Sequence, residues 1–252
     1  MVRAIMHGCN GRMGRVITGL IKEDEAIKIV AGVDSYTEVA NDYPVYESIG
    51  ACDVEADVVI DFSNAGAIDK LLDYCVDHKL PVVLCSTGLS EAQLEKVEES
   101  AKETAVLKSA NMSMGINLLL ELLKNAAKVL SPAGYDIEIV EKHHNQKLDA
   151  PSGTAIALAD SIDEALGGTL EYIYDRSKER RKRGTKEIGI SAVRGGTIVG
   201  EHEVLFAGVD EVIEFKHTAY SRSVFGKGAV EAAKYLAGKP AGRYDMSDVI
   251  QF

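Results

Sequence analysis

The segment Val2-Arg3-Ala4-Ile5-Met6-His7-Gly8-Cys9-Asn10-Gly11-Arg12-Met13-Gly14 predicts the architecture of the first half of this chain. Residues 2–6 form a short apolar strand, the glycines form a turn, and residues 16, 17, 20 and 21 give the following helix one apolar face. Glycines in such a turn let the backbone approach a pyrophosphate, whose charge meets the positive end of the helix. The spacing is G-x-x-G-x-x-G rather than G-x-G-x-x-G, so the motif alone is a weak signal.

The next strand strengthens this interpretation. Residues 27–33 are apolar and end at Asp34, an acid placed to bind a ribose diol. A dinucleotide site is therefore favoured over a purely structural strand-turn-helix unit. Ser35 follows, and no Lys or Arg occurs between Lys28 and Lys70. A 2′-phosphate would meet a carboxylate without a local cation, which favours NAD over NADP, although Arg12 remains an alternative partner for that phosphate.

Strands and helices then alternate. Apolar strands are predicted over 57–62, 81–85 and 105–108, with helices through residues 71–75 and over 90–103. This alternation predicts an α/β fold with a Rossmann-like, doubly wound parallel sheet, whose ligand lies beyond the carboxyl ends of the strands. Phe62 and the loops 85–87 and 109–112 fall on that edge, although each loop alone is more typical of a turn than of a contact.

The pattern changes after residue 114. A long apolar helix is followed by a strand, a helix, and then strands near 170–174, 188–193, 202–207 and 212–217 with few helices between them. Runs of strands predict a second α+β domain with a mixed or antiparallel sheet. The basic segment 178–183 is interpreted as a solvated loop rather than a binding patch, because the whole chain is acidic. The sequence does not assign the last helix, near 222–236, to either domain.

The segment Glu141-Lys142-His143-His144-Asn145-Gln146-Lys147-Leu148-Asp149-Ala150-Pro151-Ser152-Gly153-Thr154-Ala155 carries the chemistry. It lies between an apolar strand, 135–140, and a helix that extends to Leu166. Ser152 is a good N-cap, and the first turn after it, with Gly153 and Thr154, suits a carboxylate. Lys147 can add a cation or a proton.

His143 is the better proton donor of this segment, because histidine titrates near pH ~6.5 whereas lysine needs a perturbed environment. If the strand continues, His143 and His144 point to opposite faces, unless the loop turns both toward the site. A metal site is disfavoured, because the two histidines are neighbours and no third ligand has a useful spacing.

Composition limits the possible functions. The 252 residues suit one large or two small domains, and the net charge of -11 with no Trp argues against a nucleic-acid surface. The four cysteines include no Cys-x-x-Cys pair, so they are interpreted as reduced thiols. No signal peptide or membrane-spanning run is apparent, which favours a cytoplasmic protein without a membrane partner.

Together these motifs resemble the 4-hydroxy-tetrahydrodipicolinate reductase (dihydrodipicolinate reductase) family. The resemblance covers nearly the whole chain and rests most specifically on residues 141–155, with support from 8–14, 61–63, 86–88, 110–111, 199–202 and 245–246. It implies NAD(P)H-dependent reduction of a cyclic imine dicarboxylate, with loss of water, in diaminopimelate and lysine biosynthesis. It also implies a homotetramer, a dinucleotide domain of residues 1–112 plus 222–252, and a substrate-binding and oligomerisation domain of residues 113–221.

The resemblance assigns roles to individual residues. Catalysis falls on His143, with Lys147 as the second proton donor, and substrate binding falls on His144, Lys147, Gly153 and Thr154. The cofactor contacts are Gly8, Cys9, Asn10, Gly11, Arg12, Met13, Asp34, Cys85, Ser86, Thr87, Ser109, Ala110, Asn111 and Met112.

Two positions depart from the family pattern. Ser35 stands where relatives that use NADP well usually have arginine, which supports NADH as the preferred cofactor, with NADPH possible. Cys85 stands where glycine is common, so the detail of that cofactor loop stays open.

Two other functions compete with this interpretation. One is a different NAD-dependent oxidoreductase on the same scaffold, such as an amino-acid dehydrogenase. The other is a dinucleotide sensor without catalysis, against which the cluster of His143, His144 and Lys147 argues, because a sensor needs no proton donor.

Overall fold

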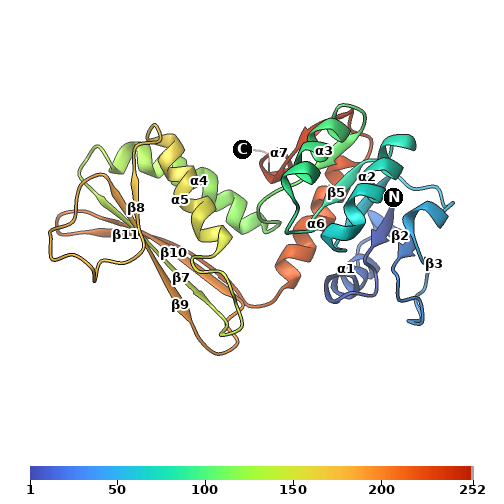
Figure 1. The fold of residues 1–252 in the computed structure, drawn as a ribbon, viewed down its shortest axis with the longest axis horizontal. Coiled ribbons are helices and arrows are strands. Elements are labelled where there is room, and N and C mark those ends of the chain that lie inside the picture. The colour runs from blue at the N-terminus through green and yellow to red at the C-terminus, as the bar shows by residue number, and fades with distance from the viewer. Residues whose placement is uncertain (251–252) are drawn as a thin grey trace. The chain divides into compact units, whose positions relative to one another are not determined.

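The computed structural model describes residues 1–250, which form two compact units (Figure 1). Unit 1 combines residues 1–114 with the chain from residue 223 onward, and unit 2 is Gly115–Arg222. The chain therefore leaves unit 1 once and returns to it. Within the described residues, no helix has the length and apolar character needed to cross a membrane.

Unit 1 is built on a parallel sheet of seven strands in the order β12-β6-β5-β4-β1-β2-β3. Its strands are β1 (Val2–His7), β2 (Ile27–Val33), β3 (Val45–Tyr46), β4 (Val58–Asp61), β5 (Val82–Leu84), β6 (Ala105–Leu107) and β12 (Gly242–Tyr244). Its helices are α1 (Arg12–Lys22), α2 (Ile68–Asp77), α3 (Glu91–Ala101), α6 (Ser223–Leu236) and α7 (Met246–Val249). The predicted doubly wound parallel sheet is confirmed.

The central strands of unit 1 are buried on both faces. Ala4 and Met6 of β1 lie in a core with residues of α1 and α6, whereas Ile5 lies in a second core with residues of α2 and α3. Successive side chains of a strand point to opposite faces, so a strand covered by helices on both sides must be apolar at consecutive positions. This requirement explains the uninterrupted apolar runs of β1 and β4.

Short elements of unit 1 were not predicted from the sequence. No strand or helix is predicted over residues 35–55, but they include β3 and the 3-10 turn η1 (Ile49–Ala51). Near the C-terminus, β12 pairs with β6 and α7 follows it. Elements of two to four residues are too short to show a hydrophobic period, so only their tertiary contacts reveal them.

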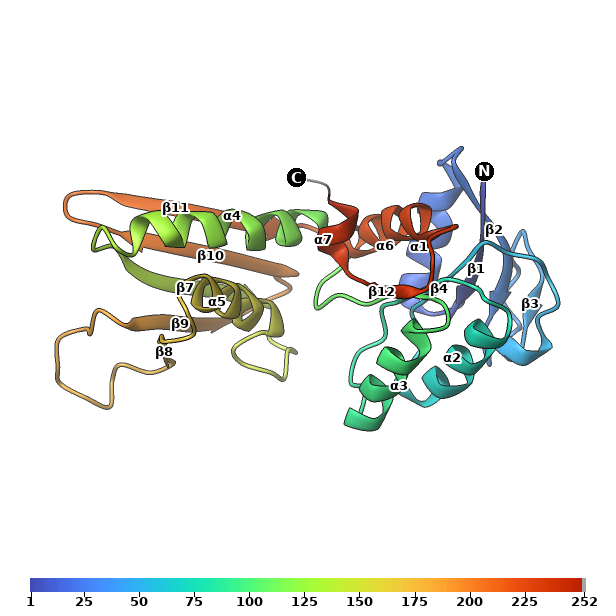
Figure 2. The same cartoon turned by 90° about the horizontal axis from the view of Figure 1, so that it is seen from above.

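Unit 2 contains a mixed sheet in the order β11-β10-β7-β9-β8. The neighbours of β10 are antiparallel to it, whereas β9 is parallel to both β7 and β8. The strands are β7 (Asp136–His143), β8 (Glu171–Ile173), β9 (Glu187–Arg194), β10 (Gly200–Ala207) and β11 (Val212–Ala219). The helices α4 (Met114–Leu130) and α5 (Gly153–Ala165) pack on one face of the sheet and share its apolar core (Figure 2). The predicted second α+β fold is confirmed.

Two segments of unit 2 differ from the prediction. Strand β7 continues to His143 rather than ending at residue 140, because Glu141 and His143 keep the alternation of buried positions. In the basic segment 178–183, Lys178 and Arg180 are exposed as expected. Arg183, in contrast, donates to the Asp136 carboxylate and to the Ile137 carbonyl, which attaches this part of the loop to β7.

The glycine turn gives the first test. A Cβ atom at Gly14 would lie 2.2 Å from the Gly8 carbonyl oxygen, whereas a Cβ at Gly19, in the same helix, would meet no atom within 4 Å. We expect Gly14→Ala to lower the free energy of unfolding by about 1–3 kcal/mol through overpacking. Gly19→Ala should be neutral or stabilising by up to about 1 kcal/mol, because alanine favours a helix. Urea unfolding measures both, and equal effects would refute the close contact.

Candidate active site

The turn after β1 is shaped for close approach of a ligand to the backbone. Gly8 has a φ of +82°, which favours glycine, and a Cβ there would lie 2.6 Å from the Phe62 carbonyl oxygen. Gly11 occupies the N-cap of α1 without a side-chain capping bond. The N-cap residue thus offers no side-chain acceptor to the first N–H groups of α1, which suits the binding of an anion.

Asp34 lies beside this turn. One of its carboxylate oxygens accepts from the Asn10 backbone N–H at 3.0 Å, and the other accepts from the Tyr36 N–H at 3.0 Å. The Asn10 side chain donates to the Tyr36 carbonyl at 2.5 Å. These bonds hold the acid predicted to bind ribose against the turn predicted to bind pyrophosphate.

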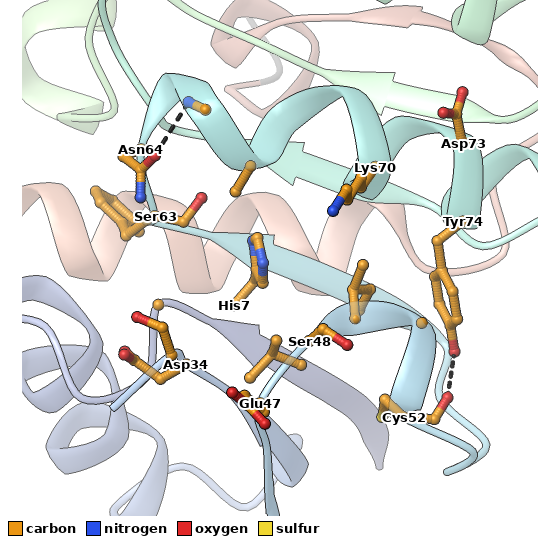
Figure 3. A pocket seen from close by; sticks show the side chains of 18 of the residues that line it. His7, Asp34, Glu47, Ser48, Cys52, Ser63, Asn64, Lys70, Asp73 and Tyr74 are labelled. Carbon is orange, nitrogen blue, oxygen red and sulfur yellow. Dashed lines mark hydrogen bonds between the residues drawn. The ribbon is translucent and has the colours of Figure 1, made fainter. Parts of the chain in front are cut away.

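A cavity of about 1000 Å³ opens at this edge of the sheet (Figure 3). Its wall includes Gly8, Gly11 and Asp34 from the predicted cofactor set. The remaining predicted residues of the turn, Cys9, Asn10, Arg12 and Met13, lie outside the wall, with Cys9 completely buried. Phe62, which the sequence placed at this edge, is also part of the wall. Most of the other wall residues, in the segments 47–53 and 63–67 and in α2, have no predicted contact with a ligand.

The other two predicted cofactor loops follow β5 and β6. They share the carboxyl edge of the sheet with the glycine turn, because all these strands are parallel, but they do not line the cavity. Burial raises the pKa of Cys85 well above its ordinary value, so this thiol is protonated at neutral pH. Ser86 and Met112 are buried, Thr87 and Ala110 are exposed, and Ser109 and Asn111 are half-buried.

His7 is a cavity residue that the sequence analysis missed. Its Nδ1 lies 2.7 Å from the buried Asp61 carboxylate, which also accepts from the Ser63 hydroxyl at 2.6 Å. Figure 3 shows His7 between Asp34 and Lys70. Its position as the last residue of β1, beside the point where the strand order reverses, was the available signal.

The charge of the cavity wall is mainly negative. Lys70 is the one lysine or arginine among the wall residues of the described chain. The carboxylates of the wall are those of Asp34, Glu47, Asp53, Asp73 and Asp77.

In unit 2, strand register gathers ionisable groups at one end of the covered sheet face. Glu141 and His143 are two residues apart on β7, so they share that face. His202 of β10 lies opposite Glu141, and Arg194 of β9 lies opposite His143. The other end of the same face is apolar and packs under α4 and α5. Arg194 and His202 come from segments distant from residues 141–155, so no role at the site is predicted for either of them, although residues 199–202 support the family resemblance.

The His143 ring is held on several sides. Its Nδ1 lies 2.6 Å from the Glu141 carboxylate, and its ring meets the His202 ring edge-on at 5.1 Å between centroids. A Cβ at Gly200 would come within 3.1 Å of His143 Nε2, so glycine leaves space beside that atom. Burial lowers the pKa of His143, while the Glu141 carboxylate acts in the opposite direction. Burial also lowers the pKa of His202, to about 4.

The loop after β7 brings the predicted anion-binding groups together. Ser152 caps α5 by accepting from the Ala155 N–H at 3.1 Å, and α5 begins at Gly153 as predicted. Lys147 forms an ion pair with Asp149 at 2.9 Å. The Lys147 ammonium lowers the pKa of Asp149, and the Gly153 backbone N–H contributes in the same direction. Lys147 and Gly153, which are predicted to bind a substrate carboxylate, thus stabilise the carboxylate of Asp149 in this structure.

His144 lies beyond the end of β7, in the loop, and is half-buried. It therefore does not take the opposite-face strand position that was one of the two sequence expectations.

Comparison with known proteins identifies the family. The model of the dihydrodipicolinate reductase N-terminus matches residues 2–112, and the model of its C-terminus matches residues 115–250. The chain belongs to the dihydrodipicolinate reductase family. Among curated relatives, the 4-hydroxy-tetrahydrodipicolinate reductase of Caldanaerobacter subterraneus subsp. tengcongensis is 54% identical over 251 residues, covering 100% of this chain and 99% of the relative. The enzyme of the same name from Clostridium tetani is 52% identical over 246 residues, covering 98% and 96%.

Solved structures share the fold. A dipicolinate-bound dihydrodipicolinate reductase from Paenisporosarcina sp. TG-14 aligns over 100% of both chains with a TM-score of 0.81 at 22% identity. A myo-inositol dehydrogenase from Corynebacterium glutamicum aligns over 93% of this chain and 87% of its own with a TM-score of 0.56 at 14% identity. The two-unit architecture thus also occurs outside the dihydrodipicolinate reductase family.

Proposed function

We propose that this protein catalyses the NAD(P)H-dependent reduction of 4-hydroxy-tetrahydrodipicolinate to tetrahydrodipicolinate, with loss of water, in diaminopimelate and lysine biosynthesis. Full-length relatives that carry this enzyme name support the assignment. The structural observation that carries it is the segment from Glu141 to Thr154. There a buried imidazole is followed by a loop in which Lys147 and the Gly153 N–H stabilise a carboxylate.

Unit 1 fits a nicotinamide dinucleotide. The closely packed Gly8, the helix N-terminus at Gly11 and the Asp34 carboxylate suit a pyrophosphate and its adjoining ribose. We propose that the rest of the turn, 9–13, and the loops 85–87 and 109–112 complete the cofactor site. When bound, the reduced nicotinamide supplies a hydride.

The substrate is proposed to be held by its carboxylates in unit 2. The related Paenisporosarcina reductase binds dipicolinate, which is also a ring dicarboxylate. In this chain, Lys147, Gly153 and Thr154 would grip one carboxylate at the start of α5, with His144 as a further contact. Asp149 would give up its contacts with Lys147 and Gly153 to the substrate. Orientation of the ring is the main benefit of such a grip.

His143 is proposed to deliver the proton, with Lys147 as the second donor. Glu141 accepts at Nδ1, so Nε2, beside Gly200, is the atom that exchanges a proton with substrate. Burial lowers the pKa of this ring in the ligand-free chain. A bound dicarboxylate favours the protonated form, because an opposite charge nearby stabilises the imidazolium.

The cofactor is proposed to be NADH in preference to NADPH. The cavity wall carries five carboxylates and one lysine, and Ser35 offers no charge beside Asp34. A 2′-phosphate would be repelled by this surface, whereas a ribose diol would donate hydrogen bonds to it.

The protein is further proposed to be a cytoplasmic homotetramer. The sheet of unit 2 presents its second face, with Val140, Val193 and Leu205, without a helix over it in the described chain. Val193 is 44% exposed. An uncovered sheet face with apolar residues is suited to burial against other copies.

The first test of the function uses substrate generated by the preceding synthase of the pathway, with NADH oxidation as readout. We expect multiple turnovers by the wild type, and a loss of about 10²–10⁴-fold in kcat for His143→Ala, because a general acid contributes this much. The affinity for NADH should stay the same. Lys142→Ala, the neighbour on the opposite strand face, is the control and should keep most activity. Unchanged turnover of His143→Ala would remove this residue from its role.

The cofactor preference is tested at Ser35. Ser35→Arg should improve NADPH binding by about tenfold, because a charge-assisted contact of ~1.4 kcal/mol is added next to the 2′-phosphate. Ser35→Ala adds no charge and should leave the ratio of the two affinities unchanged. Fluorescence titration with both cofactors measures this ratio. A wild-type protein that binds NADPH tenfold more tightly than NADH contradicts the proposed preference.

The assembly is tested by sedimentation equilibrium. We expect the mass of four chains for the wild type, and smaller species for Leu205→Glu, which places a charge on the uncovered face. A wild-type monomer would contradict the proposal.

A further inference from the structure

Glu141 is completely buried, yet its carboxylate has a donor at every side. One oxygen accepts from His143 Nδ1 at 2.6 Å and from Arg194 Nη1 at 2.8 Å. The other accepts from Arg194 Nη2 at 2.6 Å and from the Ser152 backbone N–H at 3.0 Å. A carboxylate has about four acceptor positions, so this one is saturated. Loss of any of its three partners would leave this buried charge partly uncompensated, which is strongly destabilising.

The contact with His143 determines the tautomer of that ring. An ionised carboxylate only accepts hydrogen bonds, so Nδ1 of His143 carries the proton in both charge states. Nε2 is then the one ring nitrogen that gains and loses a proton. Gly200 leaves space beside Nε2, so the exchanging atom is also the accessible one.

The same carboxylate connects His143 to the anion-binding loop. Ser152 donates its N–H to Glu141, and its hydroxyl caps the helix that begins with Gly153 and Thr154. Arg194 completes the connection by donating to the Asp149 carbonyl at 2.8 Å. The position of the proton donor is thereby coupled to the position of the carboxylate grip.

We infer that Glu141 is the positioning residue of this reductase, fixing the orientation and tautomer of His143, and that Arg194 anchors Glu141 for this purpose. This inference rests on the proposed function, because it gives His143 a proton to deliver. Neither Glu141 nor Arg194 contacts substrate in this role. Both act through the imidazole.

The charges around His143 predict a second effect. Burial lowers its pKa, Lys147 and Arg194 lower it further, and Glu141 is the neighbouring group that raises it. His202 of β10 meets the His143 ring, and His217 of β11 lies beyond it, opposite His202. Burial lowers the pKa of His202 to about 4 and also lowers the pKa of His217, so both are neutral at pH 7. Without the Glu141 charge, the lowering effects of Arg194 and of Lys147, which is paired with Asp149, are no longer opposed by Glu141. The pKa of His143 should then fall, so its ring should lose the proton at a lower pH than in the wild type.

The test is Glu141→Gln in the full-length protein, assayed with synthase-generated substrate and NADH. We expect kcat to fall by about 10²–10⁴-fold, the range for general acid catalysis, with the KM for NADH unchanged. The alkaline limb of the kcat/KM profile, which reports the free enzyme, should move to lower pH. Arg194→Lys keeps the cation but loses the two-pronged contact, and should give a smaller loss.

Glu187→Gln is the matched control. Glu187 is also buried, at 4% exposed, belongs to the same sheet and is paired with two arginines, Arg176 and Arg181. It lies at the opposite end of β9 from Arg194. This variant should lose stability in thermal unfolding but keep the wild-type pH profile.

Nitrogen-15 NMR of the histidines gives a readout that does not depend on turnover. We expect the proton of neutral His143 on Nδ1 in the wild type and a mixture of tautomers in Glu141→Gln. An unshifted pH profile with an unchanged tautomer would overturn the inference and leave Glu141 a structural residue. Absence of turnover by the wild type would instead overturn the proposed function, while the NMR result would still test the tautomer.

Discussion

A buried carboxylate is unfavourable unless hydrogen-bond donors contact its oxygens, and Glu141 of unit 2 is completely buried. Its donors come from β7 itself, from β9 and from the start of α5. The requirement explains why β7 continues past its aliphatic section to His143. It also explains how a nine-residue loop of mainly exposed and half-buried residues, 144–152, ends at a defined helix N-terminus. One buried charge thus fixes the geometry of the local segment 141–152 relative to the distant end of β9.

Unit 1 depends instead on close contacts between backbone segments. Gly8 packs on the Phe62 carbonyl, Gly14 packs on the Gly8 carbonyl, and Gly228 packs on the Met112 carbonyl. Each contact removes the room for a side chain. The first two join the glycine turn to the end of β4 and to α1, and the third joins helix α6 to the loop after β6. At the glycine turn itself, the backbone is therefore open to close approach by a ligand. This suits a pyrophosphate, whereas the buried ion pairs of unit 2 suit the positioning of a titrating imidazole.

Both proposed sites rest partly on signals that are local in the sequence. The glycine turn and Asp34 are local signals, and the parallel sheet follows from the alternation of apolar runs. The segment 141–155 is local as well, so His143, Lys147 and the helix start at Gly153 could be proposed together. Glu141 was within reach of the same reasoning, because its spacing of two from His143 places both on one face of a strand. The short β12 and α7 were not, because they depend on docking against β6 and α6.

The sequence by itself determined the order of the longer strands and helices, the α/β and α+β character of the two units, and the segment that carries the proposed proton donor. These properties depend on hydrophobic period and turn chemistry, which act over a few neighbouring residues. Only the tertiary structure decided that Arg194 and His202 join Glu141 and His143, and that His7 and Lys70 line the wall beside Asp34. Strand pairing and register create these groupings, and a shift of one residue would turn each side chain to the other face. Such long-range alignment leaves no periodic signal in the chain.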